Sequence, residues 1–210
     1  NTVQGRCLVR IAISGEGDLP FDDLMGSRPF DVERRERAED ISVMLYTSGT
    51  TGRAKGVPRS QYSERAAALA HVLQNGYKDG ERTLGVMPLY HTMGIRLLLS
   101  TALVNGCFVC QSHFDAEEAL TLIERERVTA LYLVPTLYHD LLDHESFENR
   151  DLTSVRKLGF AGAPMEDSLL KRLDQAFHPE LFVNHYGSSE IYTFTVEPHA
   201  AENPGSAGKA

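Results

Sequence analysis

The chain has 210 residues, of which 42% are hydrophobic and 24% are charged, and its formal net charge is -8. This is the composition of a globular domain with a sizeable core, and the acidic balance argues against non-specific binding to nucleic acid or to a membrane surface. No apolar run reaches the roughly 18 residues that predict a membrane-spanning helix, no signal peptide is evident, and the few cysteines favour a reducing cytoplasm.

Cys107 and Cys110 form a C-x-x-C pair inside an apolar, strand-like run. Residues i and i+3 of a strand point to opposite faces, so the two thiols would not converge on a metal, and we expect both to be structural. The eight histidines follow no metal-binding spacing.

The residues before position 41 predict little regular structure. A strand is expected at 7–14, a helical turn at 21–25 and a charged connection at 28–40. Because the chain lacks an initiator Met and closes on a glycine-rich stretch, we expect it to be an excerpt of a longer protein. We divide it into a lead-in segment, residues 1–40, and a core, residues 41–210.

Strand-like and helix-like patterns alternate along the core. The β-branched, apolar run at 41–46 is a candidate buried strand. Asp115 is a favourable N-cap, and Pro135 is a favourable first helical residue. This alternation predicts an α/β fold with a mainly parallel sheet flanked by helices. Further strands are expected at 83–87, 108–111, 128–134, 155–160, 181–186 and 191–196, and helices at 60–73, 95–104, 116–127, 135–142 and 167–177.

Glycine-rich or histidine-bearing loops follow several of the predicted strands. They cover residues 47–56, 88–94, 161–164 and 187–190. Parallel α/β sheets bind ligands at the carboxyl ends of their strands. We therefore expect these four loops to share one edge of the sheet.

The first of these loops combines hydroxyls, glycines and one lysine. It reads Thr-Ser-Gly-Thr-Thr-Gly-Arg-Ala-Lys-Gly from Thr47 to Gly56. Glycines let backbone N–H groups turn inward, hydroxyls donate to oxygens and Lys55 supplies positive charge, so a strand, this loop and a helix from about Ser60 predict a phosphate cradle. A Ser/Thr/Gly-rich surface loop is the plainer alternative. The spacing fails the Walker pattern, and neither a Ser-hydrolase elbow nor a dinucleotide fingerprint occurs.

The loop instead resembles the phosphate loop of the adenylate-forming superfamily, which includes acyl- and aryl-CoA synthetases, peptide-synthetase adenylation domains and luciferases. It matches the family pattern Thr-Ser-Gly-Ser/Thr-Thr-Gly-x-Pro-Lys-Gly, except that Ala54 replaces the usual proline. Four later segments resemble family motifs in the right order: 88–94, 162–164, 184–190 and 204–208. The resemblance covers about residues 41 to 210. It implies an excerpt of the large N-terminal domain, with the ribose-binding aspartate, the C-terminal domain and its lysine lying outside this chain.

The resemblance also implies the chemistry. A small-molecule carboxylate would be activated with ATP and Mg²⁺ to an acyl-adenylate and then transferred to coenzyme A. Lys55 and the loop hydroxyls would hold the β- and γ-phosphates, Glu190 would bind Mg²⁺, and His91 would border the carboxylate and the thiol entry. Tyr186 would stack on adenine, and Ser189, which stands where the family has threonine, would reach the α-phosphate. The residues implied to bind ATP are Thr47, Ser48, Gly49, Thr50, Thr51, Gly52, Lys55, Gly162, Ala163, Pro164, Asn184, His185, Tyr186, Gly187 and Ser189.

Several of these residues have a plainer interpretation when taken alone. Glu190 could be a solvated acid at a strand start, His91 a loop histidine and Tyr186 a core aromatic residue. Arg96 could be a substrate handle, but its pattern favours a solvated helix residue.

The substrate class is indicated by an absence of acids. No Asp or Glu occurs between Pro88 and Thr101, which disfavours a free amino acid and favours an aryl or medium-chain carboxylate. Two alternatives stay open: an adenylating enzyme that loads a carrier protein, and a non-catalytic nucleotide- or acyl-binding relative. A homodimer is one option for the assembly. The chain alone is expected to have feeble activity at most.

Overall fold

The computed structural model describes residues 11–12, 19–20, 36–48 and 53–210. The chain divides into two compact units, Asn1–Glu36 and Arg37–Ala210. In the first unit, β1 (Ile11–Ala12) and β2 (Leu19–Pro20) form a short parallel pair. β1 lies within the strand predicted at 7–14, whereas the helical turn predicted at 21–25 lies outside the described residues.

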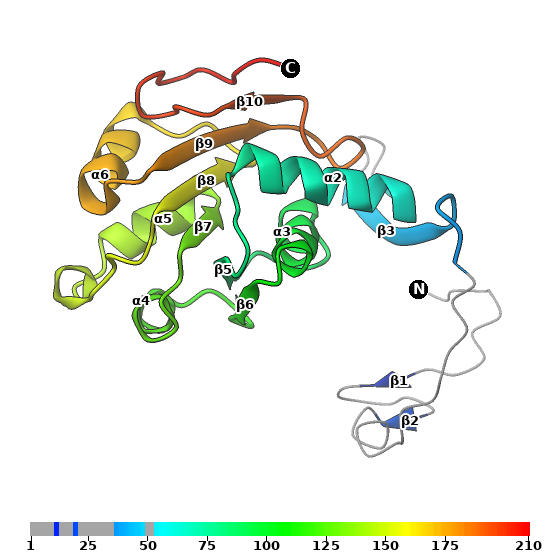
Figure 1. Ribbon diagram of the computed structural model, residues 1–210, viewed down its shortest axis with the longest axis horizontal. Helices are drawn as coiled ribbons and strands as arrows, with labels where there is room; N and C mark the ends of the chain where they lie inside the picture. Colours follow the sequence, from blue (N-terminus) through cyan, green and yellow to red (C-terminus); the bar gives the residue numbers. More distant parts are fainter. Residues whose placement is uncertain (1–10, 13–18, 21–35, 49–52) are drawn as a thin grey trace. The chain divides into compact units, whose positions relative to one another are not determined.

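The second unit is built on a six-stranded sheet with the order β10-β9-β8-β7-β5-β6 (Figure 1). Every neighbouring pair is parallel except β9 and β10. The predicted mainly parallel sheet is therefore confirmed. Its strands are β5 (Arg82–Gly85), β6 (Cys107–Cys110), β7 (Ala130–Leu133), β8 (Lys157–Ala161), β9 (Leu181–Tyr186) and β10 (Thr195–Glu197).

Helices cover both faces of this sheet, and β7 shows why. Leu131 and Leu133 pack into a core with helices α4, α5 and α6, whereas Tyr132 faces a second core that contains Leu97 of α3. Successive strand residues point to opposite faces, so one fully buried strand supplies both cores. The helices are α2 (Gln61–Gln74), α3 (Thr92–Leu103), α4 (Ala116–Arg125), α5 (Pro135–Leu142) and α6 (Asp167–Phe177), with a 3-10 turn, η1 (Phe147–Asn149), after α5.

Local sequence signals fix the ends of these helices. Oδ1 of Asp115 accepts a hydrogen bond from the backbone N–H of Glu118 at 2.8 Å, which satisfies one of the free donors at the start of α4. α5 begins at Pro135, whose missing N–H costs nothing at a first helical position. Both predictions are confirmed. Helix α3 begins at Thr92, three residues before the predicted start at Ile95.

The predicted strand at 41–46 does not belong to the six-stranded sheet. β3 (Ile41–Ser48) pairs antiparallel with β4 (Ala54–Ser60), and this hairpin forms a separate sheet. Tyr46 is 66% exposed, so the prediction of a buried strand was wrong. β4 was missed because its Gly56 and Pro58 disfavour strands, a cost that an edge pairing tolerates.

The hairpin also corrects the expectation about the loops. β3 and β4, which flank the predicted phosphate cradle, form an antiparallel pair outside the parallel sheet, whereas the prediction placed a strand before it and a helix after it. The loops after β5, β8 and β9 do follow parallel strands of the one sheet and share its carboxyl edge. The predicted strand at 191–196 was also placed too early, because the chain folds back before β10 begins at Thr195.

Candidate functional site

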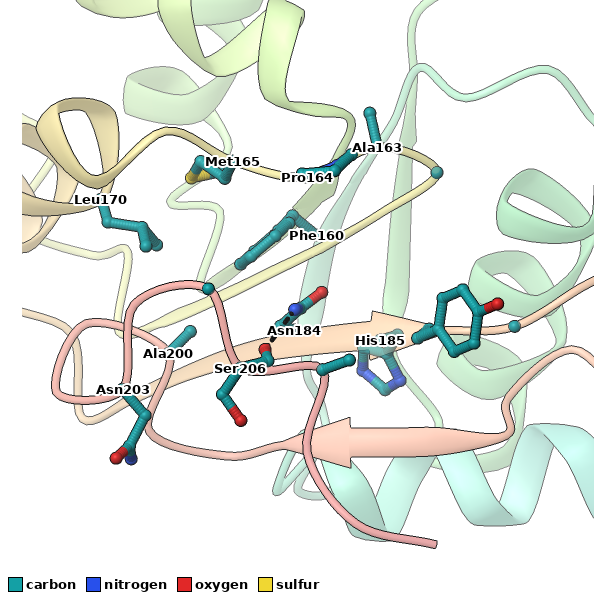
Figure 2. A pocket seen from close by; sticks show the side chains of 15 residues that line it. Phe160, Ala163, Pro164, Met165, Leu170, Asn184, His185, Ala200, Asn203 and Ser206 are labelled. Carbon is teal, nitrogen blue, oxygen red and sulfur yellow. Dashed lines mark hydrogen bonds between the residues drawn. The ribbon is translucent and has the colours of Figure 1, made fainter.

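A pocket of about 260 Å³ lies at the carboxyl ends of β8 and β9 (Figure 2). The segments after these two strands form part of its wall, and the segment before the C-terminal end of the chain forms another part. Seven residues predicted to bind ATP line it: Gly162, Ala163, Pro164, Asn184, His185, Tyr186 and Gly187. The wall also includes Gly205, Ser206 and Ala207 of the motif predicted at 204–208, which had been given no role. The residues that the prediction missed are Phe160, Met165, Leu170, Ala200 and Asn203.

Asn184 joins two walls of this pocket. Its side-chain amide Nδ2 donates to the backbone carbonyl of Ser206 at 2.8 Å (Figure 2). The hydroxyl of Ser206 in turn donates to Glu197 of β10 at 2.8 Å. These bonds hold the Pro-Gly-Ser segment beside β9, so the pocket is formed from segments that are far apart in the sequence.

His185 lies next to Asn184 but its side chain faces the opposite side of the sheet. Nε2 of His185 lies 3.2 Å from Oδ1 of Asn75, the C-cap residue of α2, and its ring stacks on that of His71 with centroids 5.4 Å apart. Burial, followed by the charge of Arg96, lowers the pKa of His185 well below its usual value. The side chain is therefore a neutral, buried group packed under β9, while the residue borders the pocket through its place on the strand.

Tyr186 ends β9 at the mouth of the pocket. It is 58% exposed, and its ring lies near that of Phe194, with centroids 5.8 Å apart. An exposed ring supported from one side is available to stack on a planar ligand. The plainer interpretation of Tyr186 as a core residue is wrong.

The loop after Tyr186 turns back on itself and presents Glu190. A Cβ atom on Gly187 would lie 1.7 Å from the carbonyl oxygen of Tyr192, so only glycine fits there. The turn is closed by a hydrogen bond from the Tyr192 N–H to the carbonyl of Ser188 at 2.7 Å, and Tyr192 has a φ of 67°. Within this loop Ser189 is half-buried and Glu190 is exposed.

Glu190 and Lys55 are electrostatically coupled. A hydrogen bond from the side chain of Ser188 lowers the pKa of Glu190 below its usual value, its own backbone N–H lowers it further, and so does the charge of Lys55. Lys55 is exposed on β4, opposite the half-buried Thr47 of β3. The hairpin contacts the loop of Glu190 through Arg59 on β4, whose Nη1 donates to the backbone carbonyl of Glu190 at 2.5 Å. The side chain of Ser48 and residues 49–52, including Gly49, Thr50, Thr51 and Gly52, lie outside the described residues.

His91 occupies the N-cap position of α3, and its side chain makes no capping hydrogen bond. It is exposed, and its ring centroid lies 4.6 Å from that of Tyr90. Neither His91 nor Glu190 lines the pocket described above. The first turn of α3 nevertheless approaches the pocket wall, because a Cβ atom on Gly162 would lie 4.0 Å from Sδ of Met93.

Arg96 is not the solvated helix residue that its pattern favoured. It is 3% exposed, and its guanidinium donates to the hydroxyls of Thr193 and Tyr132. The guanidinium carbon also lies 5.2 Å from the ring centroid of Tyr132. Helix α3 turns this residue toward the sheet, where hydroxyls and aromatic rings surround its charge.

The part of the chain that the structure describes contains no group of three or more His, Cys, Asp or Glu side chains that could hold a metal ion. Cys107 and Cys110 are free thiols, the first half-buried and the second exposed. A hard cation that uses one carboxylate and completes its shell with phosphate oxygens and water would fit Glu190, and Mg²⁺ binds in this way.

The fold and the pocket define a class of protein, the α/β proteins that bind ligands at the carboxyl ends of a parallel sheet. The chain belongs to the AMP-binding enzyme family, whose model matches residues 6–210.

Individual relatives agree with this assignment. The chain is 38% identical over 182 residues to a 4-chlorobenzoate–CoA ligase of Pseudomonas sp. strain CBS-3, covering 82% of this chain and 34% of the relative. The inhibitor-bound N-terminal domain of FACL13 from Mycobacterium tuberculosis matches with a TM-score of 0.83 and 26% identity, over 90% of this chain and 48% of that chain. An o-succinylbenzoate coenzyme A synthetase from Bacillus subtilis, solved with ATP and magnesium ion, matches with a TM-score of 0.77 and 27% identity, over 90% of this chain and 40% of that one. The chain thus spans about a third of the length of the curated relatives it matches.

Proposed function

We propose that the protein that carries this chain activates a carboxylic acid with ATP and transfers the acyl group to coenzyme A. One observation carries the proposal: the pocket at the ends of β8 and β9 adjoins the loop of Glu190, whose backbone carbonyl accepts a hydrogen bond from Arg59 on β4, the strand that also carries Lys55. A cation, an ionised acid and a pocket with an aromatic mouth are the groups that a nucleoside triphosphate requires. The similarity to a 4-chlorobenzoate–CoA ligase supports the same chemistry.

The proposed reaction has two steps. A carboxylate oxygen of the substrate attacks the α-phosphorus of ATP, the bond to the oxygen bridging to the β-phosphate breaks, and pyrophosphate leaves with the electron pair. The deprotonated sulfur of coenzyme A then attacks the acyl carbonyl, and AMP leaves.

The role proposed for each residue in this reaction follows from its charge and shape. Lys55 holds the phosphates that depart, because a cation stabilises negative charge that develops on a leaving group. Tyr186 stacks on the adenine, beside the backbone of 162–164 and the amide of Asn184. Ser189 donates to the α-phosphate, and His91 borders the carboxylate and the thiol. Glu190 is the residue that would hold Mg²⁺, which supplies charge neutralisation at phosphate oxygens when bound.

The substrate is proposed to be an aryl or medium-chain carboxylate. No acid occurs between Pro88 and Thr101 to pair a substrate ammonium group. The helix that follows His91 offers apolar side chains, and Met93 and Leu97 lie in the core shared with Tyr132.

The proposal is tested with the full-length protein, ATP, Mg²⁺, coenzyme A and a panel of aryl, medium-chain and amino acids. AMP formation and the mass of the acyl-thioester product are measured together. We expect AMP and an acyl-CoA with an aryl or medium-chain acid. AMP release with no acyl-CoA, but with acylation of a carrier protein, would move the assignment to a carrier-loading enzyme. No AMP with any acid would contradict the proposal.

A further inference from the structure

A buried ion pair lies between the hairpin that carries Lys55 and the loop that carries Glu190. Nε of Arg59 on β4 lies 2.7 Å from Oε1 of Glu64 in the first turn of α2. The side chains are 9% and 4% exposed. A pair so poorly solvated costs desolvation energy that its attraction only partly offsets, so stability alone does not account for it.

The pair holds the β9 loop at two points. Nη1 of Arg59 donates to the backbone carbonyl of Glu190 at 2.5 Å. The hydroxyl of Tyr192 donates to the carboxylate of Glu64, with distances of 3.0 and 2.9 Å to its two oxygens. The guanidinium carbon of Arg59 also lies 4.1 Å from the ring centroid of Tyr192, within cation–π range. The residues on both sides of Ile191 are thereby tied to one guanidinium–carboxylate pair.

The same strand carries both cations. Lys55 and Arg59 are four residues apart on β4, so they lie on one face of the strand and about 13 Å apart along it. Arg59 contacts the backbone of Glu190, and the charge of Lys55 acts on its carboxylate. A shift of the Glu190 loop along β4 would break the hydrogen bond from Arg59 to the Glu190 backbone. It would also change the distance between Lys55 and the Glu190 carboxylate.

We propose that Arg59 is a positioning residue, which with Glu64 and Tyr192 sets the Glu190 loop against the strand that carries Lys55 so that the acid and the lysine face one bound nucleotide. The inference rests on the proposed function. Partners that orient a metal-binding carboxylate usually contribute 10- to 100-fold to metal affinity or activity, and we expect roughly this effect here.

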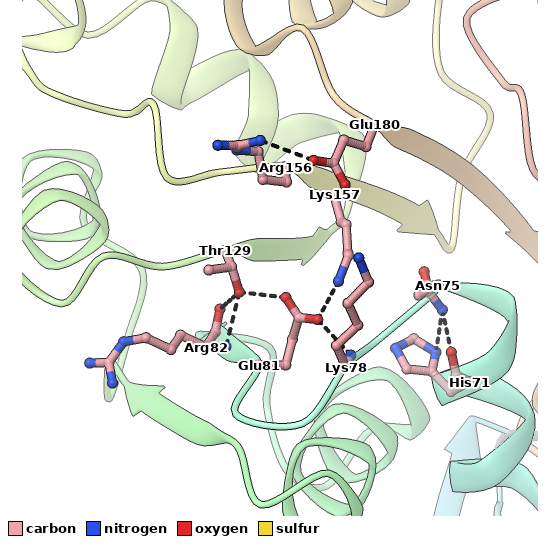
Figure 3. Close-up of polar contacts among 9 residues, drawn as sticks. All are labelled: His71, Asn75, Lys78, Glu81, Arg82, Thr129, Arg156, Lys157 and Glu180. Atoms are coloured by element: carbon pink, nitrogen blue, oxygen red, sulfur yellow. Dashed lines mark hydrogen bonds and ion pairs between the residues drawn. The ribbon is translucent and has the colours of Figure 1, made fainter.

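The test compares two buried ion pairs, one between β4 and α2 beside the Glu190 loop and one where β5 and β8 begin. The first variant, Arg59→Met with Glu64→Gln, removes both charges and leaves no buried ion without a partner. The matched control is Lys157→Met with Glu81→Gln. Lys157 contacts Glu81 where β8 and β5 begin, far from the carboxyl edge, and Figure 3 shows that Glu81 also accepts from Thr129 and Lys78. The side chains of this control pair are 10% and 3% exposed, which matches the burial of the test pair.

Two quantities are measured on the full-length protein. The first is the Mg²⁺ concentration that gives half-maximal carboxylate-dependent pyrophosphate exchange. The second is the affinity of Mn²⁺ for the ATP-bound protein, measured by electron paramagnetic resonance without turnover. We expect the Arg59/Glu64 variant to weaken both by roughly 10- to 100-fold. The Lys157/Glu81 variant should leave both at the wild-type values.

Further measurements distinguish a folding defect of the double variant, a failure of the positioning role and a failure of the proposed function. Tyr192→Phe removes one hydroxyl from the network and should weaken Mn²⁺ binding in the same direction by less, whether or not the double variant folds. Folded variants with Mg²⁺ and Mn²⁺ dependence equal to that of the wild type would overturn the positioning role alone. A wild-type protein that neither binds ATP nor catalyses exchange would overturn the proposed function, and the inference with it.

Discussion

The amide oxygen of Asn75 lies 3.2 Å from Nε2 of His185, beneath the carboxyl end of β9. The same amide donates through Nδ2 to the backbone carbonyl of His71 at 2.9 Å. Burial lowers the pKa of both histidines well below the usual value, and the charge of Arg96 lowers it further. Two neutral imidazoles, each within hydrogen-bond distance of the Asn75 side chain, therefore pack beneath the strand that carries the pocket residue Asn184.

This pair predicts a loss of stability in mild acid. In the unfolded chain both histidines take up protons near pH 6.5, whereas in the folded chain they resist protonation, so the unfolded state binds more protons as the pH falls. Each histidine should reduce the free energy of unfolding by up to about 1.4 kcal/mol per pH unit below that value. Urea denaturation at a series of pH values measures the slope. His185→Gln should flatten it, and an unchanged slope in that variant would contradict the assignment.

Gly187 is predicted to be irreplaceable in the loop that presents Glu190. An added methyl group would collide with the Tyr192 carbonyl and push the loop away from Arg59 and Lys55. Gly187→Ala should therefore reduce ATP affinity, as measured by isothermal titration calorimetry. Gly80→Ala is the control, because nothing lies within 4 Å of its added Cβ, although its φ of 75° adds a backbone strain that is absent at Gly187. It should cost about 1 kcal/mol of stability and leave ATP binding intact. Equal ATP affinity in both variants would refute the close-contact argument.

Leu131 is predicted to be a major contributor to folding. It is 1% exposed at the centre of the sheet, and Leu131→Ala should lower the free energy of unfolding by about 2–5 kcal/mol. Leu73 on α2 is 80% exposed, so Leu73→Ala should change it by less than about 0.5 kcal/mol. Chemical denaturation of the two variants measures the contrast, and similar losses would show that the β7 core is misplaced.

Asp115 is predicted to stabilise α4 through its side-chain oxygen. Asp115→Ala should cost about 1 kcal/mol, because the N–H of Glu118 loses its acceptor. Asp115→Asn keeps an acceptor oxygen and should preserve most of the stability, although it loses some interaction with the helix dipole. Thermal denaturation of both variants distinguishes the cap from a general charge effect. An alanine variant as stable as the wild type would argue that the cap is unimportant.

The regular elements could be predicted because their signals are local. α4 has a capping aspartate and acids in its first turn, α5 begins with proline, and β9 is a short branched and apolar run bounded by turn residues. Their alternation was enough to predict a parallel sheet with a ligand edge.

The hairpin and Arg96 could not be predicted, for related reasons. β4 contains a glycine and a proline, so its pairing with β3 depends on a partner strand rather than on its own propensity. Arg96 is charged, and only the packing of α3 against β7 shows that Tyr132 and Thr193 accept its donors. Contacts between side chains that are far apart in the sequence produce no periodic pattern from which they could be predicted.

Only part of the candidate site could be predicted from the sequence. Motif resemblance predicted residues at the end of β9 and in the loops after β8 and β9, and the pocket contains seven of them. The opposite wall, including Asn203 and Ala200, and the Arg59–Glu64 pair depend on tertiary contacts. The roles assigned to His91, Lys55 and Glu190 stay predictions for experiment.

The measurement that tests the central claim most directly is carboxylate-dependent exchange of labelled pyrophosphate into ATP by the full-length protein. It reports formation of the acyl-adenylate without requiring the thiol. The account predicts exchange with at least one aryl or medium-chain acid, and a loss of roughly 100-fold or more in Lys55→Ala and in Glu190→Ala. Lys55→Ala removes a cation that stabilises the leaving pyrophosphate, and Glu190→Ala removes the carboxylate that would hold Mg²⁺. Exchange that persists in both variants, or a wild-type protein that shows none with any acid, would contradict it.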